Sequence, residues 1–412
     1  MPKGVLILIL MAWPFAVLAQ GNDVLEFEIK VSDKLTVQDV VNAAFNKSPD
    51  QFVVGSKEQY AQALSSRASS LFADTPEISI RLQNDRLFSN QGLKEWESSL
   101  NMPLWMPGQK SANRQKARMS DQEAKAYQDL ALLNVTGLVR EILWEIKLAA
   151  AQLGQARDNL KVAEDLGNDI ARKIEAGNLP RQNSILAQKE IMTRKMDLIK
   201  AEAEYIHAGR EYESITGLME MPAEFEEVAA IDIDTDNVPI LNLYRAKVDG
   251  LEAEYNIQRK SWGKAPTLSL GVKRETSSFM DQNINSIGVG LSVPLGASAH
   301  VKSKRAEAAV VLAEMEREQA LINREYRLSL HEGEHELEVC ESQLPLSASH
   351  FEMSQENLRL GQKAFDMGET DLFDLLKIQE QFFSSSAENT QIIIECKRAI
   401  ARHNQVKGVL LP

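Results

Sequence analysis

Four short stretches of the chain alternate apolar residues with small or polar ones. This period of two predicts strands at about residues 75–84, 97–105, 265–274 and 285–295. Each strand would carry one apolar face and one small or polar face, which is the pattern of a membrane β-barrel around a wet interior. Two ordinary soluble hairpins are the alternative interpretation. The apolar positions are Ile78, Ile80, Leu82, Leu100, Met102, Leu104, Leu268, Leu270, Val272, Ile287, Val289, Leu291 and Val293.

Each strand pair is followed by a long run with an apolar residue at every seventh position. In the second run these residues are Leu330, Leu337, Leu344, Phe351, Leu358 and Phe365. The positions 191 residues earlier hold Val139, Ile146, Leu153, Leu160, Gly167 and Ile174. A seven-residue period indicates helices packed along a coiled-coil-like seam. We therefore expect helices from roughly 108 to 175 and from roughly 298 to 366, each about 100 Å long.

The two halves of the chain repeat each other at an offset of 190 to 191 residues. TPEISIRLQ (75–83) matches APTLSLGVK (265–273), LNMPLW (100–105) matches LSVPLG (291–296), and Gly177 falls on Gly368. Each half thus predicts a helix, a strand pair, a long helix, a reversal at a glycine and a returning helix. The first repeat would span 20–217 and the second 239–412. We interpret the acidic connector between them, 218–238, as solvated surface without chemistry.

Four strands are too few to close a barrel, and an open sheet edge cannot face lipid. Several copies of the chain must therefore contribute strands to one barrel. The predicted fold class is mainly α, with a membrane β-barrel that is shared between chains and continued by long helices.

Residues 1–19, MPKGVLILILMAWPFAVLA, have the features of a secretory signal peptide cut before Gln20. Lys3 precedes an apolar run, and small residues stand at its end. The run is shorter than a spanning helix needs, and Pro14 interrupts it. We therefore expect export to the bacterial periplasm or outer membrane, without a lipoprotein cysteine at the new N-terminus.

The net charge and the cysteine count of this 412-residue chain exclude several classes of partner and site. Its formal charge of −13 makes nucleic acid a poor partner and a cation-tolerant surface a better one. The only two cysteines, Cys340 and Cys396, allow one disulfide at most. They exclude a disulfide-stapled scaffold and a Cys-rich zinc site, and we expect them to be ordinary helix residues.

One short motif suggests an enzyme. HEGEH, residues 331–335, fits the H-E-x-x-H pattern of zinc proteases. The chain has only six histidines, and none gives the extended zinc-protease spacing. Counted from Leu330 in the seam, His331 lies about 100° and His335 about 140° around the helix, on its polar side. We interpret the stretch as a solvated helix face centred on Gly333. The two histidines are metal-ligand candidates, and no cofactor is predicted.

The order of these features resembles the TolC-type outer-membrane efflux proteins. The resemblance runs from LTVQDVVNAAFNKSPD (35–50) through PLWMPGQKSANRQKA (103–117) and VPLGASAHVKSKRAEA (293–308) to the last helix, with glycine reversals in EAGNLPRQNSILAQ and DMGETDLFDLLKIQ. It implies a homotrimer with a 12-stranded outer-membrane barrel, continued by a periplasmic α-helical barrel. It also implies a passive exit duct, not an enzyme, that works with a periplasmic adaptor and an inner-membrane pump of the RND type.

The length and the missing anchor cysteine are similar to outer-membrane members of heavy-metal cation efflux systems, such as the cobalt–zinc–cadmium type. This likeness implies divalent heavy-metal cations as the cargo. Drugs or protein exported by type I secretion are alternative cargoes. A soluble periplasmic coiled-coil adaptor and a zinc metalloprotease are alternative functions.

The resemblance also implies roles for residues at the two helix reversals. Adaptor-docking tips would involve Gly177, Leu179, Gly368 and Glu369. Asp371 and Asp374 lie three apart on one helix face, at the place of the family's acidic periplasmic aperture, where threefold symmetry would form a cation-favouring ring. For structural reasons alone, the glycines also suit a tight reversal and the aspartates an N-terminal helical turn.

Overall fold

The computed structural model describes residues 29–89, 91–231, 234–261, 263–276, 283–295 and 299–411. The predicted signal peptide, 1–19, lies outside these residues. The first half contains β1 (Lys30–Ser32), α1 (Val37–Lys47), α2 (Asp50–Ser69), β2 (Glu77–Asn84), β3 (Lys94–Pro103), α3 (Gln109–Glu175) and α4 (Gln182–Thr216). The second half contains β4 (Glu220–Pro222), α5 (Pro239–Lys260), β5 (Thr267–Thr276), β6 (Ile284–Ser292), α6 (Ala299–Met367) and α7 (Leu372–Val406).

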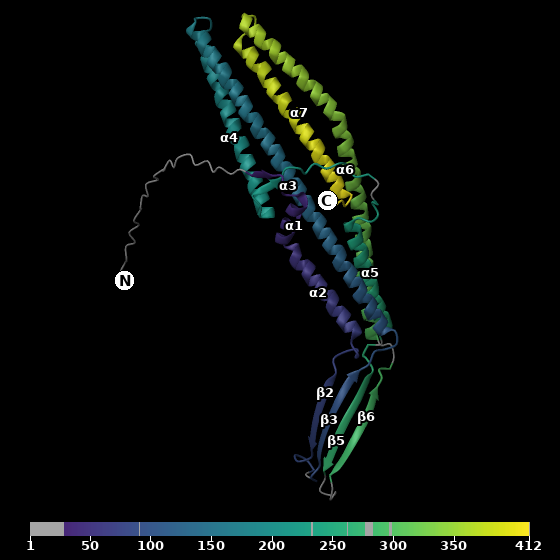
Figure 1. Cartoon of the computed structure of the whole chain (residues 1–412). Coiled ribbons are helices and arrows are strands. Elements are labelled where there is room, and N and C mark those ends of the chain that lie inside the picture. Colours follow the sequence, from purple (N-terminus) through teal and green to yellow (C-terminus); the bar gives the residue numbers. More distant parts are fainter. Residues whose placement is uncertain are drawn as a thin grey trace, which may run out of the picture.

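The molecule is elongated, with a small sheet at one end and two helical hairpins at the other (Figure 1). The helices α3 and α6 have 67 and 69 residues, which corresponds to about 100 Å each. α4 returns along α3 and α7 returns along α6, while α2 and α5 cover the halves of the long helices nearer the sheet. The predicted fold class, a duplicated strand pair and long helix, is confirmed. Among the described residues, no helix is both long and apolar enough to cross a membrane.

The seam between α6 and α7 has two rows of residues. The predicted row of large residues, from Leu330 to Phe365, is buried or half-buried along its length. The second row, which the apolar pattern does not reveal, contains the small buried residues Gly333, Cys340, Ser347 and Gly361. These small residues let the two helices approach closely. A Cβ atom at Gly361 would lie 2.9 Å from Cδ1 of Ile378 on α7.

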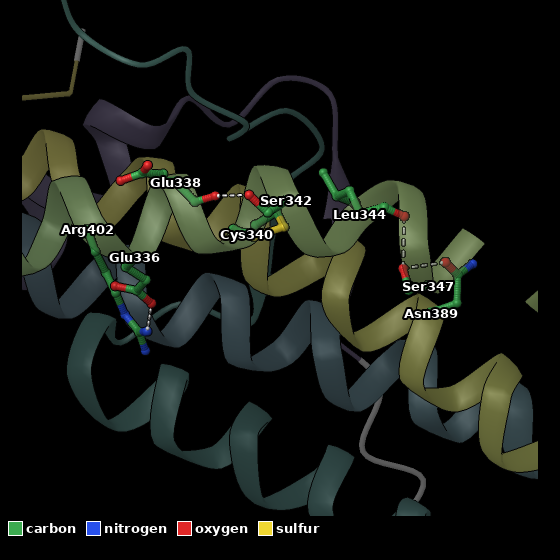
Figure 2. Close-up of a disulfide and its surroundings, with 9 residues drawn as sticks. Glu336, Glu338, Cys340, Ser342, Leu344, Ser347, Asn389 and Arg402 are labelled. Atoms are coloured by element: carbon green, nitrogen blue, oxygen red, sulfur yellow. Dashed lines mark hydrogen bonds and ion pairs between the residues drawn. A yellow bond between two sulfur atoms is a disulfide. The ribbon is translucent and has the colours of Figure 1, made fainter. Parts of the chain in front are cut away.

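Cys340 belongs to this second row and forms a disulfide with Cys396 on α7 (Figure 2). The expectation that they are ordinary helix residues is therefore wrong. Their Cα atoms are 5.4 Å apart, within the usual range for a disulfide. About two turns further along the same seam, the hydroxyl of Ser347 lies 3.1 Å from Oδ1 of Asn389. The pairing of Gly333 with His403, Cys340 with Cys396, and Ser347 with Asn389 fixes the antiparallel register of the hairpin.

The main hydrophobic core lies at mid-length, where α1, α3, α4 and α7 meet. Part of the connector packs on this core, so its interpretation as solvated surface holds for exposed acids such as Glu224 and Glu226 and is wrong for Phe225 and Glu227. Phe225 meets the buried Trp144 edge to face, with ring centroids 5.0 Å apart. Glu227 accepts two hydrogen bonds of 2.8 Å from the buried guanidinium of Arg140. β4, within the connector, also pairs in parallel with β1.

Candidate functional site

The four main strands form one antiparallel sheet in the order β2-β3-β5-β6. Their register aligns the apolar positions of all four strands on one face. The rows across this face are Ile78, Leu100, Leu270 and Val289, then Ile80, Ser98, Val272 and Ile287. Many of these side chains are exposed, including Ile80 at 66% and Ile287 at 84%. A contiguous exposed apolar face of this kind marks a surface that another apolar phase or protein covers.

The opposite face of the sheet is small or polar. One row contains Ser79, Ser99, Gly271 and Gly288, and another contains Arg81, Glu97, Lys273 and Ser286. The Nζ atom of Lys273 lies 3.3 Å from Oε2 of Glu95 on the neighbouring strand. A Cβ atom at Gly271 would lie 3.1 Å from the backbone oxygen of Ser98, so this position is closely packed. The sheet thus separates an apolar surface from a polar one.

The sheet is open at both sides. β2 and β6 each pair with one neighbour only, and every residue of both strands is exposed. Unpaired backbone groups along such edges form hydrogen bonds with a further strand readily. An edge that faces lipid must be paired, because no water is available there. Both edges therefore need partners if the apolar face meets lipid.

At the far end of the molecule, both helical hairpins turn at a glycine. Gly177 and Gly368 have φ angles of +77° and +75°. The amides of Gly177 and Asn178 donate to the carbonyls of Ile174 and Lys173, which is a Schellman motif, and Gly368 ends α6 in the same way. A Cβ atom on either glycine would meet nothing within 4 Å. Their backbone conformation, not crowding, thus explains these glycines.

The other two predicted tip residues differ in their environment. Leu179 is half-buried and packs against a cluster that joins the two hairpins, with Ile170, Phe365 and Leu372 among its buried members. Glu369 is exposed. Only Glu369 of this pair therefore presents its side chain freely at the tip.

Asp371 and Asp374 are both exposed and both belong to the start of α7. Asp371 is the N-cap, and its Oδ1 accepts a hydrogen bond of 2.9 Å from the backbone amide of Asp374. Asp371 therefore precedes the helix instead of sharing a helical face with Asp374. Its capping role is structural and exists whether or not the pair lines an aperture.

His331 and His335 are exposed, with ring centroids 6.4 Å apart and an angle of 24° between the rings. Gly333 between them is buried, and a Cβ atom there would lie 3.7 Å from Cα of His403. The centre of HEGEH is thus a helix contact, not the centre of a solvated face as expected. Within the described residues, no group of three or more His, Cys, Asp or Glu side chains is arranged to hold a metal ion.

Two partly buried charge clusters join the hairpins to each other, and the sequence does not reveal their contacts across the hairpins. Glu141 on α3 binds Arg398 and Arg402 on α7, and Arg402 also donates to Glu336 on α6 (Figure 2). Burial raises the pKa of Glu141, but hydrogen bonds from the two arginines outweigh it and lower the pKa overall. Arg194 on α4 forms the second cluster with Glu190 and, across the hairpins, Glu380. Glu190 lies four residues before Arg194 on the same helix, but the partners across the hairpins are distant in sequence and follow no local spacing.

Among the comparisons with known proteins, those with solved structures identify the fold. No family model matches the chain. The cobalt-zinc-cadmium resistance protein CzcC of Cupriavidus metallidurans is 21% identical over 213 residues. This match covers 48% of the chain and only about half, 50%, of that relative.

Solved structures match over most of the chain. The CmeC outer membrane channel of Campylobacter jejuni has a TM-score of 0.71 and 14% identity, covering 93% of this chain and 90% of CmeC. The outer membrane protein VceC of Vibrio cholerae has a TM-score of 0.73 and 12% identity, covering 90% of this chain and 96% of VceC. The MtrE outer membrane channel of Neisseria gonorrhoeae, in its open state, has a TM-score of 0.66 and 12% identity, covering 90% of this chain and 88% of MtrE. The chain therefore has the fold of the TolC-type outer-membrane channels.

Proposed function

We propose that this protein is the outer-membrane exit duct of a tripartite efflux system. The observation that carries the proposal is the open four-stranded sheet, apolar on one face and polar on the other, joined directly to helices of about 100 Å. A sheet of this kind suits a membrane wall, and the helices extend it into a long periplasmic passage. The fold shared with solved outer-membrane channels supports this assignment.

The duct is a homotrimer. Three chains with four strands each form a 12-stranded barrel in which β6 of one chain pairs with β2 of the next. The apolar face then meets the lipids of the outer membrane, and the polar face lines the aqueous lumen. Pairing around the ring removes the open edges that a single chain leaves.

The disulfide supports export of the chain. Structural disulfides form and persist in oxidising compartments such as the periplasm, and seldom in the cytosol. Cys340 and Cys396 lie in the helical part, which would occupy the periplasm. An amino-terminal secretory signal in residues 1–19 would provide the route.

The helical tips face the inner membrane, where a periplasmic adaptor docks and an inner-membrane pump of the RND type supplies energy. The duct itself is passive and catalyses no reaction. Glu369 is the docking residue most open to a partner, beside the reversals at Gly177 and Gly368 and the half-buried Leu179. Asp371 and Asp374 contribute a ring of charge at the periplasmic aperture.

The proposed cargo is a divalent heavy-metal cation. Its support is the match to a cobalt-zinc-cadmium resistance protein over about half the length of each chain. An acidic chain, with a formal charge of −13, also tolerates cations along its surface. Drugs and secreted protein are the alternative cargoes, and the growth experiment below separates them from metals.

The experiment is deletion of the gene in its native host, followed by growth on graded zinc, cobalt, cadmium, copper and drugs. We expect lower tolerance of divalent metals, restored by the wild-type gene on a plasmid. A variant of the exposed Glu369 tests adaptor docking in the same assay. Glu369→Arg reverses the charge of the side chain without changing the core. We expect a plasmid carrying this variant to restore metal tolerance only in part. Unchanged metal tolerance in a host without a second duct, together with lost drug tolerance, would contradict the metal cargo.

The aperture assignment requires substitutions that keep the helix cap. Asp371→Asn removes the charge and retains the capping oxygen, whereas alanine would also remove the cap. We expect Asp371→Asn/Asp374→Asn to reduce block by divalent cations in planar bilayers. Identical block and conductance in the two proteins would remove both residues from the aperture.

Two other functions predict different outcomes. A soluble periplasmic adaptor would be recovered in the soluble periplasmic fraction, whereas a duct is recovered with the outer membrane. A zinc protease needs a third ligand beside His331 and His335, and the described part of the chain places none there.

A further inference from the structure

We propose that His331 and His335 form a two-histidine site for a transition-metal cation such as Cu²⁺, on the face of α6 that points away from α7. The motif is not needed for the duct, and the first repeat has no counterpart, since REILW occupies the equivalent positions. The site therefore goes beyond the proposed function, and its test does not depend on transport.

The helix places both histidines opposite the α6–α7 seam. Gly333 faces α7, since a Cβ atom there would lie 3.7 Å from Cα of His403. Successive helical residues are 100° apart, so the residues two before and two after Gly333 lie about 160° from it, on either side. His331 and His335 are therefore neighbours on the outer face, one turn apart.

The described residues leave both histidines exposed on this face. α6 packs against α7 along the hairpin and against α5 nearer the sheet. α5 begins at Pro239, and the preceding Val238 packs with Tyr326, so α5 leads away from residues 331–335. Both histidines are exposed, and within the described residues neither takes part in a hydrogen bond or ion pair. Their ring nitrogens are thus available to a metal ion.

The helix prepares the pair for chelation. Residues four apart on a helix have Cβ atoms about 6 Å apart, which lets two imidazoles reach one ion at about 2.0–2.1 Å from each nitrogen. The rings already lie on the same side, with centroids 6.4 Å apart and planes within 24°. The pair lies in the interior of a 69-residue helix, so the helix is already formed before the metal binds. Metal binding therefore carries no cost of helix formation.

The charge around the pair also favours a cation. Glu332, Glu334 and Glu338 are exposed within one turn of the two histidines. Glu336 differs from them because its carboxylate receives a hydrogen bond of 2.9 Å from Arg402. The three other carboxylates raise the local cation concentration and lie close enough to the two histidines to accept hydrogen bonds from metal-bound water.

The ligands determine the class of ion. Imidazole nitrogen suits Cu²⁺, Ni²⁺ and Zn²⁺, and affinity for a given site is highest for Cu²⁺ among divalent first-row ions. Two protein ligands leave the remaining coordination positions to water. The site would therefore bind reversibly and would not be a buried structural centre.

The experiment uses the full-length protein, purified in detergent without a polyhistidine tag, and Cu²⁺ alone as the probe. Isothermal titration calorimetry gives affinity and stoichiometry, and electron paramagnetic resonance counts the nitrogen ligands. The variants are His331→Gln and His335→Gln. The matched control is His350→Gln, an exposed histidine on the same helix whose Nδ1 lies 3.7 Å from a carboxylate oxygen of Glu388. Circular dichroism checks that all proteins keep their helices.

We expect one Cu²⁺ per chain with two nitrogen ligands. Each single variant should bind roughly tenfold or more weakly, because the second ligand of a chelate acts at high effective concentration. The His350→Gln protein should bind like the wild type. Equal affinity in the wild type and the two variants would overturn the proposal, as would an equal loss in His350→Gln. One Cu²⁺ per three chains would also overturn it, because the metal would then lie between subunits.

Discussion

At the residue scale, His403 is a buried titratable group in the α6–α7 seam. It is 5% exposed, faces Gly333, and its Nδ1 has no hydrogen-bond partner within the described residues. Burial lowers the pKa of His403, the nearby charge of Lys407 lowers it further, and Glu334 opposes both. The folded chain therefore holds this imidazole neutral to lower pH than the unfolded chain does.

This shift predicts a loss of stability in mild acid. The unfolded imidazole takes up a proton as the pH falls through about 6.5, while the folded one resists until its lower pKa is reached. Stability should thus decrease between pH 7 and pH 5, and His403→Gln should make the decrease shallower. Thermal unfolding followed by circular dichroism at several pH values measures both slopes. The exposed His350→Gln variant serves as the control, and equal slopes for His403→Gln and the wild type would contradict the assignment.

The side of a helix on which a residue lies could be predicted from the sequence only where the heptad pattern determined it. The heptad phase set by Leu330 correctly placed His331 and His335 on the polar side. It missed Gly333, because glycine carries no hydrophobic signal although a close helix contact requires it. Arg140 and Glu227 were equally hidden, since the two residues that pair in the core are 87 positions apart.

At the element scale, the two hairpins differ in one covalent bond. The hairpin of α6 and α7 contains the disulfide, whereas that of α3 and α4 has none within the described residues. The bond spans 56 positions, for which the chain-entropy model gives a stabilisation of about 4 kcal/mol. Cys340→Ala/Cys396→Ala should therefore loosen the second hairpin selectively.

Hydrogen exchange with mass spectrometry can measure this difference. Amides of α6 and α7 should exchange faster in the double variant, while those of α3 and α4 provide an internal control. Dithiothreitol should reproduce the effect in the wild type and add nothing to the variant. Uniform acceleration in both hairpins would instead mean that the disulfide stabilises the whole bundle.

Helices that carry a periodic pattern over many turns could be predicted well from the sequence, whereas strands of three residues could not. The long helices begin and end within about two residues of their expected limits, because each lies between a strand pair and a glycine reversal and carries a heptad pattern along its second half. β1 and β4 have three residues each and pair in parallel across about 190 positions, so neither carries an alternation long enough to detect. Pro345 by itself argues against a continuous helix, but the heptad positions on both sides of it correctly predicted that α6 continues past it.

At the scale of the whole molecule, the two faces of the sheet must meet different surroundings. Ile80 and Ser79 are neighbours on β2, and their side chains point to the apolar and the polar face respectively. Both positions are exposed in the single chain, so neither substitution disturbs a packed core. Any difference between them must arise from what covers each face after assembly.

In a trimeric barrel, Ile80→Lys places a charge against lipid, whereas Ser79→Lys places the same charge in the aqueous lumen. A lysine at the middle of the lipid face costs about 2–4 kcal/mol and much less near the interfaces. We expect Ile80→Lys to lower the yield of heat-modifiable trimer in the outer membrane and Ser79→Lys to leave it nearly unchanged, as measured by fractionation and gel migration with and without heating. If the yield fell equally for both, the sheet would not divide lipid from water. If Ser79→Lys alone failed, the faces would be reversed, and the open edges of β2 and β6 would require an explanation other than a barrel shared between chains.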